Sequence, residues 1–91
     1  MNGRLETIRK RLTTALAPTD LSVVDESHNH VGHAGARDGR GHFAVTIVSV
    51  AFAGKSPLER HRLVYAALGD LMQTDIHALS MQAHAPAELS Q

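Results

Sequence analysis

The sequence predicts an α+β fold in which two helices cover one face of a three-stranded mixed sheet, in the order αββαβ. Three observations support this. A helical repeat of apolar residues opens the chain, two β-rich segments flank a glycine-rich stretch, and a capped helix precedes a last alternating segment. A strand, a helix and a further strand imply a parallel crossover, which is right-handed in nearly all proteins. The length of 91 residues suits a single domain over residues 1–91.

The first half of the chain predicts a helix and then a hairpin with an enlarged tip. Apolar residues recur at helical spacing before Pro18, which ends the helix: Leu5, Ile8, Leu12, Ala15 and Leu16. LSVVDES (residues 21–27) is typical of a short strand, and HFAVTIVSV (residues 42–50) is the strongest strand signal in the chain. Residues 28–41 between them are rich in glycine and histidine, so we expect a flexible loop there.

The second helix is predicted from its N-terminal residues. Ser56 is a good N-cap, Pro57 suits the first helical position, and Glu59 completes a Ser-x-x-Glu capping box. The apolar pattern continues to residue 72, and we expect one stripe of this helix to face the core: Leu58, His61, Val64, Tyr65, Leu68, Leu71 and Met72.

The last strand is predicted over DIHALSMQA, residues 75–83. Strand alternation puts His77, Leu79 and Met81 on one face, with the His77 ring at the rim of the helix-covered face. Residues 84–91 form a tail that we expect to be a short helical turn or frayed.

Composition excludes several function classes. The chain has no cysteine, which removes disulfides, thiol catalysis and thiolate zinc sites. Nine Lys and Arg balance nine Asp and Glu, whereas dedicated nucleic-acid binders usually carry a basic excess. No apolar run would span a membrane, and the charged N-terminus does not resemble a secretory leader, so we expect a cytoplasmic protein. The AGKS segment has Ser49 where a P-loop needs glycine, and no nucleophile elbow is present, so we do not expect an enzyme.

Three histidines lie within six residues of the predicted loop: His28, His30 and His33. Their spacing lets two neutral imidazoles reach one metal ion, but the same residues also suit a solvated polar loop. His77 is, by the same reasoning, either a structural residue at the rim of the core or a ligand. The residues alone leave both alternatives open in each case.

The sequence resembles the BolA family over roughly residues 5–88. Four motifs carry the resemblance: DES (residues 25–27), HF-V-IVS (42–49), F-GKSPLERHRLVY (52–65) and IHALS (76–80). The resemblance implies a class II KH-like fold, in agreement with the αββαβ order predicted from the residue patterns.

The resemblance also implies a function. BolA-like proteins pair with monothiol glutaredoxins and share a [2Fe–2S] cluster with them and with glutathione, in cluster trafficking or in iron or redox sensing. Carried onto this chain, the family's ligands are His77 and a loop residue, best matched by His30, with His33 and His28 as alternatives. Imidazoles in place of thiolates raise the potential of such a cluster, as in Rieske centres. We expect no tightly bound cluster on the isolated chain. A homodimer is one expected form of the chain in the absence of the glutaredoxin.

Other partner contacts are expected from basic residues. In the loop, Arg37 and Arg40 either contact glutathione and acidic partner residues or remain solvated charges. The rival function is that of a DNA-binding transcriptional regulator of morphology and stress response, a role described for some BolA-like proteins. The basic start of the second helix would then supply the contacts: Lys55, Arg60, His61 and Arg62. A third alternative is a zinc or iron chaperone that uses the loop histidines without a glutaredoxin.

Overall fold

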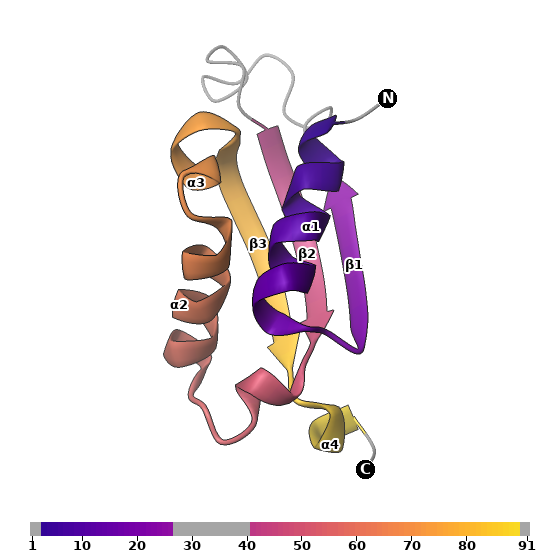
Figure 1. Cartoon of the computed structure of the whole chain (residues 1–91). Coiled ribbons are helices and arrows are strands. Elements are labelled where there is room, and N and C mark those ends of the chain that lie inside the picture. The colour runs from indigo at the N-terminus through magenta and orange to yellow at the C-terminus, as the bar shows by residue number, and fades with distance from the viewer. Residues whose placement is uncertain (1–2, 27–40, 90–91) are drawn as a thin grey trace.

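The computed structural model describes residues 3–26 and 41–89, which form the predicted α+β fold (Figure 1). Within them the sheet consists of β1 (Asp20–Asp25), β2 (Gly41–Val48) and β3 (Ile76–His84). The two long helices are α1 (Gly3–Leu16) and α2 (Pro57–Leu68). Shorter helical segments are the 3₁₀ helix η3 (Val50–Phe52), α3 (Leu71–Thr74) and α4 (Pro86–Leu89). None of the helices in these two ranges is long and apolar enough to cross a bilayer.

The central strand of the sheet is β2. It pairs antiparallel with β1 and parallel with β3, so the sheet is mixed, as predicted. Because β1 runs against the other two strands, its last residues lie at the same end of the sheet as the first residues of β2 and β3 (Figure 1). We call this the Gly41 end of the sheet.

The hydrophobic core lies between the sheet and the two long helices, which cover the same face (Figure 1). Phe43, Val45 and Ile47 are buried along one face of β2, as strand alternation predicts. The helices contribute five buried apolar residues to the same cluster: Ile8, Leu12, Leu16, Val64 and Leu68. Removing this apolar surface from water is the main source of stability.

The buried face of α2 differs from the predicted stripe. Leu58 is 58% exposed and Tyr65 is 41% exposed, whereas Val64 and Leu68 are fully buried. The prediction was wrong for Leu58 and Tyr65 because it treated residues 57–72 as one helix. The last two residues of the predicted stripe belong to α3, so they do not continue the face of α2.

The ends of α2 are set by local interactions. The Ser56 hydroxyl accepts a hydrogen bond from the Glu59 amide at 3.2 Å, and the Glu59 carboxylate accepts one from the Ser56 amide at 2.8 Å, which confirms the capping box. The bond from the Ser56 amide, more than any other interaction, lowers the pKa of Glu59. The helix ends at Gly69, whose φ of +55° is strained for any residue with a Cβ.

The predicted strand boundaries are close to the observed ones. β1 was predicted over residues 21–27 and β2 over 42–50, and each observed strand ends two residues earlier. The predicted loop over residues 28–41 lies outside the described residues except for Gly41, which begins β2. The tail forms a short helical turn at α4, one of its two predicted forms.

Candidate functional site

The Gly41 end of the sheet brings together three segments that are distant in sequence. The Glu26 amide, just after β1, donates a hydrogen bond to the His42 carbonyl at 2.8 Å. The Gly41 amide donates one to the Asp75 carbonyl, just before β3, at 2.9 Å. These bonds fix the starts of β2 and β3 relative to each other and to the end of β1.

A β-bulge controls the orientation of His77. Gly41 pairs with Ile76, but the next residue, His42, pairs with Ala78, so His77 is an extra residue in β3. Ile76 is fully buried, and the alternation resumes beyond the bulge with Leu79 packed against the core. His77 is exposed. It therefore does not share the inward face with Leu79, as unbroken alternation had predicted.

The bulge brings His77 beside a second histidine. The ring centroids of His42 and His77 are 5.2 Å apart, and the ring planes are tilted by 50°. His42 neighbours the buried Phe43 in β2, so its side chain projects from the opposite face of the sheet, away from the helices. Its Nε2 atom is buried, whereas His77 is at the surface. The pair thus places one imidazole at the surface and one just beneath it.

A shallow pocket of about 270 Å³ adjoins this histidine pair. Its lining comes from all three strands or their ends: Glu26, His42, Phe43, Ala78, Leu79 and Ser80. Sequence reasoning gave His42 no role. The signal that would have identified it is topological, because parallel strands that start together place the histidines near their first residues side by side.

The other predicted ligands lie outside the described part of the chain: His28, His30 and His33. The same holds for Arg37 and Arg40. Within residues 3–26 and 41–89, no group of three or more His, Cys, Asp or Glu side chains is arranged to hold a metal ion. The described ranges therefore contain a pair of neighbouring histidine rings rather than a closed metal centre.

Arg60, predicted as a partner contact, forms an internal clamp between α2, β3 and α4. Its guanidinium donates hydrogen bonds to the carbonyls of Lys55 and Ala83, each at 3.0 Å, and to both carboxylate oxygens of Glu88, at 2.8 and 2.6 Å. The Arg60 side chain is only 13% exposed. The Glu88 carboxylate also accepts a bond from the Ala85 amide at 2.9 Å. The bonds from Arg60 and then from Ala85 lower the pKa of Glu88 to about 2.

The remaining basic residues at the start of α2 are more accessible. Lys55 and Arg62 are exposed and His61 is half-buried. Their contact with a nucleic acid or a protein stays a prediction. Arg60 has a structural role that the sequence did not reveal, because its partner Glu88 is 28 residues away.

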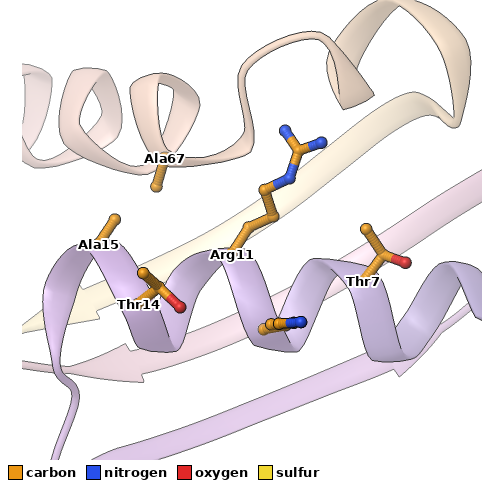
Figure 2. Close-up of a pocket in the computed structure, with 6 residues that line it drawn as sticks. Thr7, Arg11, Thr14, Ala15 and Ala67 are labelled. Carbon is orange, nitrogen blue, oxygen red and sulfur yellow. The ribbon is translucent and has the colours of Figure 1, made fainter.

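A larger pocket, of about 490 Å³, lies between α1 and α2 (Figure 2). Six residues line it: Thr7, Lys10, Arg11, Thr14, Ala15 and Ala67. The Arg11 guanidinium donates hydrogen bonds to the Leu68 carbonyl and to the Asp70 carboxylate, both at 3.0 Å. Arg11 therefore fastens α1 to the end of α2. This pocket opens on the helical side of the sheet, whereas His42 projects from the other side.

Comparison with known proteins finds one family model and several relatives that match most of the chain. The sequence model of the family described as BolA-like protein matches residues 12–88. SufE-like protein 1, chloroplastic/mitochondrial, of Arabidopsis thaliana is 47% identical over 87 residues, which cover 90% of this chain and 24% of that protein. The DNA-binding transcriptional regulator BolA of Escherichia coli is 39% identical over 79 residues, which cover 87% of this chain and 72% of that protein.

The fold agrees with the same relatives. The solved BolA domain of SufE1 from Arabidopsis thaliana has a TM-score of 0.86 and 44% sequence identity, and the alignment covers 97% of this chain and 98% of that chain. The chain thus spans about a quarter of SufE-like protein 1 but nearly all of its BolA domain. Sequence and structure agree over most of the 91 residues. The chain belongs to the BolA-like protein family.

Proposed function

We propose that this chain is a partner of a monothiol glutaredoxin and ligates a shared [2Fe–2S] cluster through histidine, in iron–sulfur cluster trafficking or in iron or redox sensing. The observation that carries the proposal is His77, an exposed imidazole that a β-bulge turns away from the core at one end of the sheet. The motif around it, IHALS, is one of those that carry the family resemblance.

The chemistry of the available donors fits an iron–sulfur cluster shared between two proteins. The chain has no cysteine, so its own contribution would be imidazole. Imidazole ligates iron in Rieske centres, where two histidines replace two thiolates on one iron. Two imidazoles are too few to complete the four ligands of such a cluster, so the partner glutaredoxin and glutathione would supply the thiolates.

The position of His77 supports a role at an interface. It lies at the Gly41 end of the sheet, beside both points at which the predicted histidine-rich loop joins the sheet. His30 is four residues beyond Glu26, so its backbone can lie at most about 14 Å from that of Glu26. The second ligand expected from the resemblance is therefore within reach of the same end of the sheet.

The test is cluster reconstitution with a monothiol glutaredoxin, glutathione, iron and sulfide, followed by visible circular dichroism. We expect a heterodimer whose spectrum differs from that of the glutaredoxin homodimer, and His77→Ala should abolish the difference. His84→Ala is the matched control, because His84 lies at the opposite end of the same strand. A wild-type mixture that yields only the homodimer spectrum would refute the proposal.

A second candidate, DNA binding, is favoured by the name of the Escherichia coli relative, a DNA-binding transcriptional regulator, and by the exposed Lys55 and Arg62. If these side chains contact phosphates, replacing both by alanine should lower duplex affinity and reduce the dependence of log K on log salt by about 2. Arg60 is unsuitable for this test because its removal would disturb α4. No measurable affinity of the unmodified chain for duplex DNA at low salt would exclude this candidate.

A further inference from the structure

We propose that two copies of this chain associate through the outer edge of β3, so that their β3 strands pair antiparallel about a two-fold axis at Ser80. Such pairing needs no metal, glutaredoxin or glutathione, so it is independent of the proposed function. Three observations support it: the direction of the backbone groups of β3, the absence of charge along that strand, and two exposed apolar side chains of α2.

Half of the backbone groups of β3 point away from the sheet. In the described part of the chain the strand order is β1-β2-β3, so β3 has a neighbouring strand on one side only. The Ser49 amide, just after β2, donates a hydrogen bond to the His84 carbonyl at 3.0 Å, so the backbone of His84 faces β2. The preceding carbonyl, that of Ala83, accepts a bond from the Arg60 guanidinium at 3.0 Å on the outer side.

The amides and carbonyls of Leu79 and Met81 face outward as well, because backbone direction alternates along a strand. An antiparallel copy of β3 can place its Met81 opposite Leu79 and its Leu79 opposite Met81. Two residues in each copy then exchange four hydrogen bonds, and Ser80 faces Ser80 of the copy on the two-fold axis. The pairing surface is therefore complementary to itself.

The clamp formed by Arg60 favours this register over its neighbours. A pairing centred two residues later would need the Ala83 carbonyl, which Arg60 already occupies. A pairing centred two residues earlier would run into the β-bulge at His77. Centring on Ser80 uses the outward groups of both copies and disturbs neither feature.

The charges of the two sheet edges indicate a second copy as the occupant of the β3 edge. Over nine residues β3 has no Asp, Glu, Lys or Arg, so pairing with itself opposes no like charges. The other edge strand, β1, begins with Asp20, ends with Asp25 and has no basic residue, so self-pairing there would gather carboxylates. Soluble proteins commonly protect an edge strand with charged side chains, and β3 lacks that protection.

Two exposed apolar side chains of α2 lie on the side of the same edge. Ala67 faces α1 across the larger pocket (Figure 2). At about 100° per residue, Leu58 and Tyr65 project roughly opposite to Ala67, away from α1. Since α2 packs on β3 and α1 on β1, that side of α2 is the side of the outer edge of β3 (Figure 1). The dimer would therefore cover apolar surface that the single chain leaves in water.

The first test uses single cysteine variants, which are specific reporters because the chain has no cysteine. In the Ser80→Cys dimer the two Cα atoms would lie about 4.5 Å apart, within the range of a disulfide. Gln82→Cys is the matched control, because it is exposed on the same face of β3 but its two copies would lie more than about 13 Å apart.

Both variants are oxidised with diamide in the presence of EDTA, which removes any metal that could join histidines of two copies. Ser80→Cys should form a covalent dimer at least about tenfold faster than Gln82→Cys, because only its thiols are within bonding distance. Equal rates for the two variants would overturn the proposal.

The second test is sedimentation velocity of the unsubstituted chain in EDTA, from about 1 μM to about 500 μM. We expect a dimer that dissociates on dilution. Tyr65→Asp should weaken it at least about tenfold by placing a charge beside the edge. Val24→Asp is the control and should leave the affinity unchanged, since Val24 is exposed on β1, the opposite edge strand. Far-UV circular dichroism confirms that each variant is folded.

A chain that stays monomeric over this range would overturn the proposal and leave the edge of β3 open to a strand of another protein. So would a Tyr65→Asp variant that dimerises as tightly as the unsubstituted chain. Neither result depends on cluster reconstitution, so the dimer and the proposed function can fail separately.

Discussion

The buried hydroxyl of Ser49 joins α1 to the segment after β2, and its removal offers a quantitative test of the fold. Ser49 is fully buried, its Oγ donates a hydrogen bond to the Leu16 carbonyl at 2.6 Å, and it accepts one from the Ala51 amide at 3.1 Å. In Ser49→Ala both bonds are lost and two backbone groups lose their side-chain partner. At about 1–1.5 kcal/mol for each, the free energy of unfolding should fall by about 2–3 kcal/mol.

The loss is a substantial fraction of the total stability expected of a chain of this size. Domains of 60–100 residues lose about 4–8 °C in Tm for each kcal/mol, so Ser49→Ala should lower Tm by roughly 10–20 °C. Urea unfolding followed by far-UV circular dichroism measures the change, and Ser22→Ala, at an exposed position of β1, is the matched control. A Ser49→Ala variant within about 0.5 kcal/mol of the wild type would refute the reasoning that these two bonds stabilise the junction.

Three further predictions concern α2 and its neighbours. Val64→Ala should lower the free energy of unfolding by about 2 kcal/mol, whereas Leu58→Ala should change it by less than about 0.5 kcal/mol, both measured by urea unfolding. The opposite order would mean that Leu58 faces the core, as the sequence pattern had predicted. Gly69→Ala should cost about 1–2 kcal/mol because φ is +55°, and unchanged stability would show that the turn rearranges freely. Glu88→Gln should be less stable than wild type above pH 4.5, and the difference in stability should shrink as the pH falls toward about 2. The reason is that the lowered pKa of Glu88 stabilises the folded state only while the carboxylate is ionised. A difference in urea midpoints that does not depend on pH would contradict this.

Local patterns predicted most of the fold. The capping box at Ser56 and Glu59 and the alternation of Phe43, Val45 and Ile47 depend on residues close in sequence, and the structure confirms them. The end of α2 at Gly69 was not predicted, because the apolar residues continue beyond the glycine. Such a pattern fits one long helix as well as two shorter helices. Treating two helices as one then placed exposed residues on the buried face of α2.

The site was less predictable because it depends on pairing between distant segments. The bulge at His77 exists only relative to Gly41 and His42 of β2, which are more than 30 positions earlier in the chain. Alternation within β3 alone therefore placed His77 on the wrong face. The neighbour His42 and the clamp between Arg60 and Glu88 are likewise products of tertiary structure, and no local motif marks them.

The start of α1 and helix α4 lie at opposite ends of β3, which matters for the placement of a fused tag. Arg4, near the start of α1, pairs with Asp75 at 3.4 Å, so the N-terminal segment lies next to the start of β3. Helix α4 follows the other end of β3 (Figure 1). The strand has nine residues and spans about 30 Å. A purification tag or fluorescent reporter placed after α4 would stay remote from the paired imidazoles, whereas one placed before α1 would lie close to them.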